Sequence, residues 1–282
     1  MVSVIIPTYN RFPLLCEAIE SVYSQTYTAY EIVVIDDGST DETPQVPSLY
    51  PEIKYFRIGH TGYPGLVRNH GVARAFGTYI AFLDSDDIWV PEKLGKQIQL
   101  CESDAETVLV HTRETWKRCD RIISQRKLKH NREGDVFVDA LRKCMIGPST
   151  VMMKKSLFES LGGFREYLEI AEDYELWLRV TACHRVSYID EPLIIKRAGH
   201  GNQLSEKYGQ IEIFRIRALQ ELVDSSWFLN HATHEHHRLA RQELSRKYMI
   251  YASGAEKRGK EAEAEESLRM SRLYADSDQR LL

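Results

Sequence analysis

Runs of β-branched residues alternate with helix-like spacing through the first hundred residues, and this alternation limits the possible folds more than any other feature. Residues 2–6 form a continuous apolar run that Pro7 ends, which is typical of a strand buried on both faces. The apolar residues of the segment 14–22 then recur at the spacing of a helix. Strand, helix and strand with short links predict βαβ units and a mostly parallel sheet. The same patterns predict further strands at 31–35, 53–58 and 79–83, and a helix at 65–75.

The second hundred residues alternate less regularly, and the chain becomes helical after them. We expect strands at 108–111, 149–153, 186–189 and 193–195, and helices at 91–100, 156–161 and 172–181. Residues 112–131 are polar and basic without a clear period, which indicates a variable excursion. Leu244 and Tyr248 then mark one face of a long helix, and a second helix follows Gly259. The pattern therefore predicts an α/β domain over residues 1–205 and a helical extension over residues 206–282.

The composition excludes several classes of protein. The 282 residues carry 37 basic and 41 acidic side chains, a net charge of −4, whereas a nucleic-acid-binding protein normally has a basic surplus. No run approaches the ~20 apolar residues of a membrane span, and the first residues lack the features of a signal peptide. The five scattered cysteines include no C-x-x-C pair, so we expect reduced thiols. We therefore expect a cytoplasmic protein, with peripheral association at the inner face of the membrane left open.

Two of the expected strands end in clusters of carboxylates. Asp36 and Asp37 follow one strand, and Asp84, Asp86 and Asp87 follow another. Ligands of an open parallel sheet bind beyond the carboxyl ends of its strands, where these acids would gather and repel one another. A divalent cation such as Mg²⁺ or Mn²⁺, completed by phosphate oxygens of a ligand, would offset that charge. The alternative is that such acids cap helices and turns, as Asp41 and Asp87 can.

Several motifs in fixed order make the chain resemble a known family. They are residues 4–11 (VIIPTYNR), 35–41 (IDDGSTD), 68–71 (RNHG), 82–87 (FLDSDD), 162–164 (GGF), 172–173 (ED) and Trp177. This set resembles the inverting family 2 glycosyltransferases of the GT-A fold over residues 1–205. The resemblance implies a Rossmann-like central sheet flanked by helices, with a nucleotide-binding half over 1–100 and an acceptor-binding half over 101–205.

The resemblance also implies an activity and its partners. The expected reaction is the metal-dependent transfer of a sugar from a nucleotide-sugar, by family bias a UDP-sugar, to a hydroxyl group. The expected acceptor is a saccharide or a lipid-linked saccharide in surface polysaccharide or glycolipid synthesis. A homo-oligomer formed through the C-terminal helices is a further expectation, and no nucleic acid is expected as a partner.

Roles for single residues follow from the same resemblance. Asp173 would be the catalytic base, and Asp86, together with His200, would bind Mn²⁺ or Mg²⁺. Glu172, Trp177 and Gly147 would lie at the acceptor site or behind the reacting groups. The residues implied in nucleotide binding are Pro7, Thr8, Tyr9, Asn10, Asp36, Asp37, Arg68, Asp84 and Ser85.

The chemistry of sugar transfer independently suits these residue types. Negative charge grows on the leaving diphosphate, so a cation held there stabilises the transition state more than the ground state. An attacking hydroxyl is a poor nucleophile, and a carboxylate such as Asp173 can accept its proton. The competing interpretation is that Glu172 and Asp173 only suit the dipole at the start of a helix; both interpretations can hold at once.

Two other functions compete with this one. A sugar-1-phosphate nucleotidyltransferase would need a glycine-rich phosphate loop, and residues 7–11 (PTYNR) have no glycine. A non-catalytic nucleotide-sugar-binding module would have no need for Asp86 and Asp173 together. The histidines at 231, 234, 236 and 237 suggest a metal site only weakly, and we expect a solvated helix face there.

Overall fold

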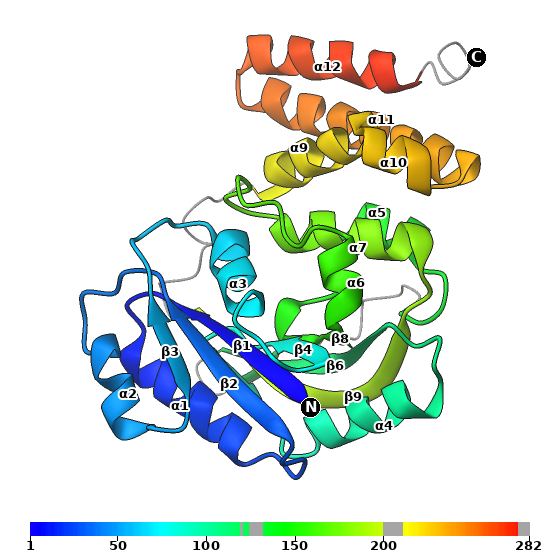
Figure 1. Ribbon diagram of the computed structural model, residues 1–282. Helices are drawn as coiled ribbons and strands as arrows, with labels where there is room; N and C mark the ends of the chain where they lie inside the picture. The colour runs from blue at the N-terminus through cyan, green and yellow to red at the C-terminus, as the bar shows by residue number, and fades with distance from the viewer. Residues whose placement is uncertain (119–120, 124–131, 200–210, 276–282) are drawn as a thin grey trace.

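The computed structural model describes residues 1–118, 121–123, 132–199 and 211–275. Within them, eight strands form a sheet in the order β3-β2-β1-β4-β8-β6-β9-β5, and a ninth strand, β7, pairs with β6. Helices cover both faces of this sheet, and the helices of the C-terminal part stack over one end of the molecule (Figure 1). The expected α/β class with a helical C-terminal region is confirmed.

The first four strands form a parallel half, as the alternation of the sequence predicts. They are β1 (Val2–Thr8), β2 (Tyr30–Asp36), β3 (Lys54–Arg57) and β4 (Tyr79–Phe82). Helices α1 (Phe12–Tyr23), α2 (Val46–Leu49) and α3 (Pro64–Val72) and a 3₁₀ turn at Thr43–Gln45 connect them. Alternate residues of β1 serve opposite cores, because Val4 clusters with residues of α1 whereas Ile5 clusters with residues of α3. Burial on both faces explains why β1, β2 and β4 are largely apolar, whereas β3 at the edge is only partly buried.

The second half of the sheet is mixed, and all its strand pairs are antiparallel except β6 with β9. Its strands are β5 (Asp87–Trp89), β6 (Leu109–Arg118), β7 (Arg121–Ile123), β8 (Met152–Lys154) and β9 (Ser187–Ala198). Its helices are α4 (Lys93–Ser103), α5 (Phe137–Arg142), α6 (Lys155–Ser160) and α7 (Glu172–Cys183), with a 3₁₀ turn at Pro148–Thr150.

Two expectations for this half are wrong. The segment 112–131 is expected as a variable excursion without a clear period, but residues 112–118 continue β6 and residues 121–123 form β7, while residues 119–120 and 124–131 lie outside the described part of the chain. The two strands expected on either side of Pro192 are one long strand, β9. Pro192 lies opposite Arg113, where the β6–β9 register shifts, because proline cannot donate the N–H that a regular ladder needs. The short elements β5 and α5 were not expected, since neither is long enough to show a period.

The C-terminal part consists of α9 (Ile211–Asp224), α10 (Ser226–His231), α11 (His234–Lys257) and α12 (Glu261–Ala275). The expected helical pair is confirmed, and Gly259 between α11 and α12 has a φ of 70°, which favours glycine. These helices share one hydrophobic cluster with α5 and α7, so they pack on the α/β domain. The solvated histidine face is wrong for His237, which is buried with its ring 4.3 Å from that of Phe228.

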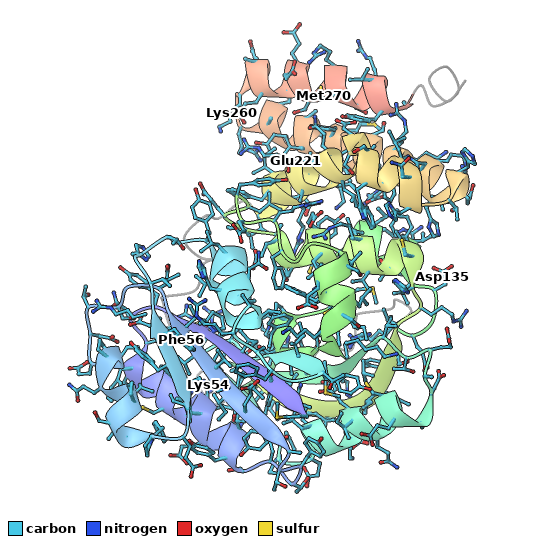
Figure 2. The ribbon with its side chains drawn as sticks, viewed as in Figure 1. Lys54, Phe56, Asp135, Glu221, Lys260 and Met270 are labelled. Carbon is cyan, nitrogen blue, oxygen red and sulfur yellow. The ribbon has the colours of Figure 1, made fainter. Side chains whose placement is uncertain are left out.

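The free edge of the sheet carries charged side chains, as the edges of natural sheets usually do. Strand β3 is an edge of the sheet, and its exposed end carries Lys54 and Phe56 (Figure 2). Lys54 binds Glu31 at 2.5 Å, and a charged side chain of this kind discourages pairing with another edge. Every helix in the described ranges is too short or too polar to cross a bilayer.

Buried polar contacts fix the start of α7 against the parallel half. Arg179 of α7 is fully buried and donates to both carboxylate oxygens of Glu175, at 2.8 and 2.5 Å, and to the carbonyl oxygens of Leu161 and Gly163. Asn69 of α3 accepts from the backbone N–H of Phe164 at 3.0 Å and donates to its carbonyl at 2.9 Å. The motif at 162–164 therefore joins α3 to α7.

We predict that Arg179→Met lowers the free energy of unfolding by about 3 kcal/mol or more, because it leaves a buried carboxylate without its partner. Urea unfolding followed by circular dichroism measures the effect. The control is Arg269→Met, since Arg269 makes an exposed ion pair with Glu266 on α12. We expect the control to leave the unfolding midpoint unchanged; equal midpoints for both variants would contradict the assigned role of Arg179.

Candidate active site

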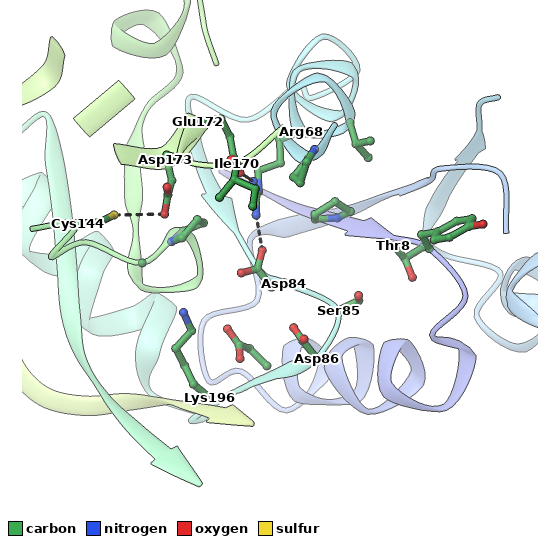
Figure 3. A pocket seen from close by; sticks show the side chains of 18 of the residues that line it. Thr8, Arg68, Asp84, Ser85, Asp86, Cys144, Ile170, Glu172, Asp173 and Lys196 are labelled. Carbon is green, nitrogen blue, oxygen red and sulfur yellow. Dashed lines mark hydrogen bonds and ion pairs between the residues drawn. The ribbon is translucent and has the colours of Figure 1, made fainter. Parts of the chain in front are cut away.

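A cavity of about 1020 Å³ opens at the carboxyl ends of β1 and β4. This is the edge of the sheet at which the sequence places its acidic clusters. Figure 3 shows that its side chains come from segments far apart in the chain, among them Thr8, Arg68, Asp84, Asp173 and Lys196.

The structure brings most of the expected site residues together. Those that line the cavity are Pro7, Thr8, Tyr9, Asn10, Asp37, Arg68, Asp84, Ser85, Asp86, Gly147, Glu172 and Asp173. Among the described residues, Asp36 and Trp177 lie outside this lining. His200 lies outside the part of the chain that the structure describes.

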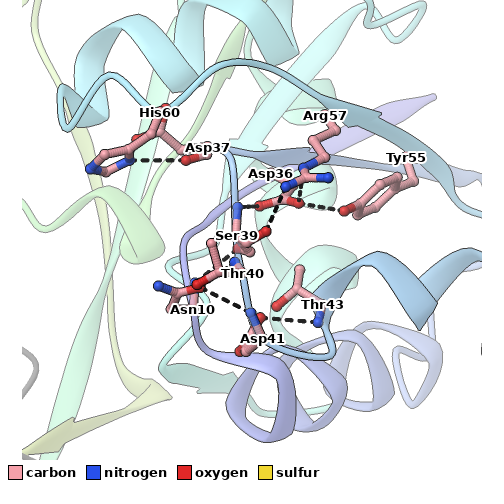
Figure 4. A network of polar contacts seen from close by, with 10 residues as sticks. All are labelled: Asn10, Asp36, Asp37, Ser39, Thr40, Asp41, Thr43, Tyr55, Arg57 and His60. Atoms are coloured by element: carbon pink, nitrogen blue, oxygen red, sulfur yellow. Dashed lines mark hydrogen bonds and ion pairs between the residues drawn. The ribbon is translucent and has the colours of Figure 1, made fainter.

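Asp36 and Asp37 are neighbours with different surroundings (Figure 4). The buried Asp36 carboxylate accepts hydrogen bonds from the backbone N–H of Ser39 at 2.8 Å and from the Tyr55 hydroxyl at 2.5 Å. Asp37 accepts from the backbone N–H groups of Thr61 and Gly62 at 2.8 and 2.9 Å. Asp36 thus shapes the loop after β2, whereas Asp37 lies at the cavity and holds the segment that leads to α3.

An aromatic pair borders the same end of the cavity. The rings of Tyr9 and His60 stack with centroids 3.9 Å apart and planes at 15°. His60 Nδ1 also lies 3.0 Å from the Asp37 carboxylate. A flat pair of this kind next to Asp37 suits the binding of a planar base. No local pattern in the sequence marks His60, because it reaches the site only through the loop before α3.

Arg68 occupies the centre of the site and joins the end of β4 to the start of α7. Its guanidinium is 2.6 Å from both the Asp84 and Glu172 carboxylates and lies over the Phe164 ring. Burial alone would raise the pKa of Asp84, but Arg68 and Lys196 lower it. Burial raises the pKa of Glu172 to about 7. The charge of Arg68 opposes this rise in pKa, and the charge of Asp173 adds to it. One guanidinium is thus shared by two carboxylates, and of these two Glu172, which has Asp173 nearby, is the one whose pKa is raised.

The acids after β4 divide between the cavity and the core. Asp86 lines the cavity and binds Arg11 at 2.9 Å. Asp87 accepts a hydrogen bond from the Ser149 hydroxyl at 2.6 Å and is buried. Burial, with the charges of Asp84 and Asp86, raises the pKa of Asp87 to about 8 against the opposing charge of Lys196. Asp87 therefore lines the cavity and also holds the buried Ser149 side chain, a contact that differs from the helix or turn cap of the alternative interpretation.

The residues at this edge fit a cation that shares its ligands with a phosphate group. Among the described residues, no group of three or more His, Cys, Asp or Glu side chains could enclose a metal. Asp84 and Asp86 nevertheless both reach the cavity, with 23% and 11% of their side chains exposed. Mg²⁺ commonly takes one or two carboxylates and completes its shell with water and substrate phosphates. The donor set therefore suits a cation brought together with a phosphorylated ligand.

Lys196 of β9 is a cation that the sequence did not single out. Its side chain is 19% exposed and points toward the middle of the cavity (Figure 3). Burial alone would lower its pKa, but the charges of Asp87, Glu114 and Asp84 raise it. A Cβ atom at Gly147 would lie 3.2 Å from both Glu114 Oε2 and Lys196 Nζ, so a glycine there leaves room for this pair.

Asp173 lies in the first turn of α7 and faces the cavity. One of its carboxylate oxygens accepts from the backbone N–H of Tyr174 at 2.7 Å, and the other accepts from the Cys144 thiol at 3.4 Å (Figure 3). Burial, followed by the charge of Asp173, raises the pKa of Cys144 well above its usual range, so the thiol stays a donor. Asp173 is therefore a helix-start acid that also borders the cavity, and its role as the catalytic base stays a prediction. Trp177, one turn further, packs in the core against Phe164.

The C-terminal part supplies the remaining wall of the cavity. Ile211 and Arg215 of α9 line it together with Glu169 and Met145. The sequence carries no signal for this contact, because α9 follows the α/β domain and its position depends on tertiary packing.

Comparison with known proteins identifies relatives of this chain. A family model described as Glycosyl transferase family 2 matches residues 3–162. An uncharacterized glycosyltransferase of Rickettsia felis is 35% identical over 205 residues, or 71% of this chain and 33% of that protein. The UDP-Glc:alpha-D-GlcNAc-diphosphoundecaprenol beta-1,3-glucosyltransferase WfgD of Escherichia coli is 30% identical over 195 residues, or 67% of this chain and 73% of that enzyme. The chain spans about a third of the length of the Rickettsia felis relative.

Solved structures confirm the GT-A fold. S. aureus TarS 1–349 in complex with UDP-GlcNAc matches with a TM-score of 0.64 over 96% of this chain and 91% of that chain, at 19% identity. The mannosyltransferase PcManGT from Pyrobaculum calidifontis, in complex with GDP-Man and Mn²⁺, matches with a TM-score of 0.62 over 99% of this chain and 87% of that chain, at 18% identity.

The raised pKa of Glu172 predicts that the free energy of unfolding depends on pH. The folded state holds the Glu172 proton up to about pH 7, whereas the unfolded chain releases it near pH 4.3. The unfolded chain therefore binds fewer protons in this window, and stability falls as the pH rises. Relative to Glu172→Gln, the wild-type protein should lose about 1–3 kcal/mol of unfolding free energy between about pH 4 and pH 7.

Urea titrations of both proteins across this window measure the difference. Glu159→Gln is the control, because the side chain of Glu159 is 59% exposed on α6. A constant difference between wild type and Glu172→Gln at all pH values would show that Glu172 is ionised throughout.

Proposed function

The chain belongs to glycosyl transferase family 2, and from this premise we propose that it transfers a sugar from a UDP-sugar to a hydroxyl group of a lipid-linked saccharide, with inversion at the anomeric carbon. The observation that carries the proposal is the placement of Asp84, Asp86 and Asp173 around one cavity at the carboxyl edge of the sheet. A module that only binds a nucleotide-sugar would not need all three there, and the family match speaks against a nucleotidyltransferase.

The donor end of the cavity is proposed to lie between β1 and the loop after β2. The stacked Tyr9–His60 pair offers a face for the base, and Asp37 offers a carboxylate acceptor for base or ribose hydrogen bonds. Thr8 adds a buried hydroxyl oxygen that makes no hydrogen bond within the described part of the chain. The choice of UDP is supported by WfgD, whose name gives UDP-Glc as its donor, and by the UDP-GlcNAc complex of TarS.

Asp86, with Asp84 beside it, is proposed to hold a divalent cation such as Mn²⁺ or Mg²⁺. When bound, such a cation supplies positive charge against the leaving diphosphate. The Mn²⁺ complex of PcManGT supports the choice of metal. His200 as a further ligand stays part of the proposal. Arg68 reaches the same region and is held in place by Asp84 and Glu172.

Asp173 is proposed as the general base. Its carboxylate accepts the proton of the acceptor hydroxyl while that oxygen bonds to the anomeric carbon. The bond from the anomeric carbon to the diphosphate oxygen breaks, and its electron pair leaves with the diphosphate. Attack from the side opposite the leaving group inverts the configuration. The Cys144 thiol donates to the second Asp173 oxygen and so orients the carboxylate.

The acceptor and the setting follow from the relatives rather than from the cavity. The acceptor in the name of WfgD is GlcNAc on diphosphoundecaprenol, which supports a lipid-linked saccharide and work at the inner face of the membrane. We also propose self-association through the C-terminal helices, because Met249, Ile250 and Leu268 are 51%, 54% and 41% exposed there.

We predict that the purified protein, with Mn²⁺ and a panel of UDP-sugars, transfers one of them to a lipid-linked GlcNAc acceptor analogue. Asp173→Asn should bind the donor normally but lower kcat by ~10²-fold or more, as loss of a general base does. Product formation by mass spectrometry and donor binding by calorimetry measure the two effects. The control is Asp190→Asn, since the Asp190 side chain is 71% exposed. Full turnover by Asp173→Asn would exclude Asp173 as the base.

We predict that Asp86→Asn removes the Mn²⁺-dependent part of UDP binding. In wild type, UDP at 100 times its Kd with Mn²⁺ should stabilise the fold by about 2.7 kcal/mol, and the variant should lose most of that gain. Thermal unfolding with UDP alone, Mn²⁺ alone and both measures the effect. Equal gains in wild type and variant would place the cation elsewhere.

A further inference from the structure

Arg215 reaches the cavity from a helix whose position is fixed by packing. Ile216 and Leu219, its neighbours on α9, are fully buried in the cluster that also contains Tyr174 and Leu178 of α7. Figure 1 shows α9 lying over α7. The helix that carries Arg215 is therefore anchored on the helix that carries Asp173.

The charge of Arg215 is poorly matched compared with the other cations of the wall. Arg68 lies between two carboxylates, and Arg11 binds Asp86. Lys196 lies among Asp87, Glu114 and Asp84, and Arg197 binds Glu17. Each of these cations therefore has either an ion pair with its own carboxylate or several carboxylates nearby.

Arg215 has no carboxylate to itself among the described residues. Its ion pair is with Glu212 on the same helix, at a long 3.4 Å. Glu212 in turn binds the buried Lys247 at 2.5 Å. Arg215 therefore shares its one carboxylate with a second cation, whereas Lys247 also lies 3.9 Å from Glu243. Glu169 and Asp173 also line this wall, but neither forms an ion pair with Arg215.

The position of this charge separates it from the donor site. The Tyr9–His60 stack and Asp86 belong to the end of the cavity that is formed by the loops after β1, β2 and β4. Arg215 reaches the cavity from α9, on the side where Cys144 and Met145 also line it. The charge of Arg215 is felt at Cys144, whose thiol contacts Asp173. The Arg215 side chain is 27% exposed, so a ligand in the cavity can reach it. A guanidinium presents a fork of donors that matches the oxygens of a phosphate group.

We infer that Arg215 forms an anion subsite that binds a phosphate group of the acceptor, next to the hydroxyl that reacts at Asp173. Arg215 is then a specificity-determining residue supplied by the C-terminal helices. The inference rests on the proposed function for the identity of the acceptor, but it makes a separate statement about which part of the acceptor is recognised.

The test compares two acceptors that carry the same sugar, one on a diphosphate-linked alkyl chain and one on a neutral alkyl chain. Arg215→Gln should raise the KM for the diphosphate acceptor about 10- to 100-fold, the range for loss of a charged hydrogen bond, and leave the KM of the donor unchanged. The KM for the neutral acceptor should change little. Arg215→Lys should recover part of the loss, because it keeps the charge but not the fork.

Arg217→Gln is the matched control, because Arg217 lies on the same helix, is exposed and does not line the cavity within the described residues. Equal KM increases for both acceptors, or none, would overturn the inference. A carboxylate-linked acceptor that matches the diphosphate acceptor in its dependence on Arg215 would overturn the assignment to phosphate.

Calorimetric binding of the diphosphate acceptor to wild type and Arg215→Gln, with UDP and Mn²⁺ present, keeps the test independent of turnover. Weaker binding by the variant supports the subsite even if no sugar is transferred, which would count against the proposed function alone. Equal binding overturns the subsite even if transfer occurs.

Discussion

The buried guanidinium of Arg68 is the interaction on which the rest of the site depends. It binds Asp84 at the end of β4 and Glu172 at the start of α7, so it joins the parallel half of the sheet to the helix that carries Asp173. Its neighbour Asn69 holds the backbone of Phe164 on the same side. An arginine buried this deeply requires paired carboxylates, because an isolated charge would be very costly there. The acids at this edge are therefore partners in one network as well as candidate ligands.

The strands of the parallel half and its helices α1 and α3 could be predicted from the sequence, since each leaves a local hydrophobic pattern, whereas the four-residue helix α2 was not predicted. The second half could not be predicted to the same extent. β5 has three residues, and the pairing of β6 with β9 depends on contacts between segments about eighty residues apart. The residues of β6 beyond Thr112 are exposed or only partly buried, so they do not face a uniform core, and they pair with β9 after a shift of register at Arg113.

The same distinction applies to the site. Residues that follow strands directly, such as Asp84 and Asp86, could be predicted, because the end of a strand fixes where they lie. Asp36 shows the limit of this rule, since its carboxylate turns into the loop while Asp37 reaches the cavity. His60, Lys196 and Arg215 lie on elements whose approach to the cavity depends on the whole fold. No spacing along the chain marks them.

Helix α7 takes part in two hydrophobic clusters at once. Leu176 and Val180 face the sheet, whereas Leu178 and Ala182 face α9 and α11. Removal of the C-terminal helices would therefore expose an apolar flank of the helix that bears Asp173. We expect the chain to melt in a single cooperative transition, and a version cut at the end of the α/β region to be prone to aggregation. The change from mixed structure up to residue 199 to purely helical structure from residue 211 then marks a change of architecture within one folding unit.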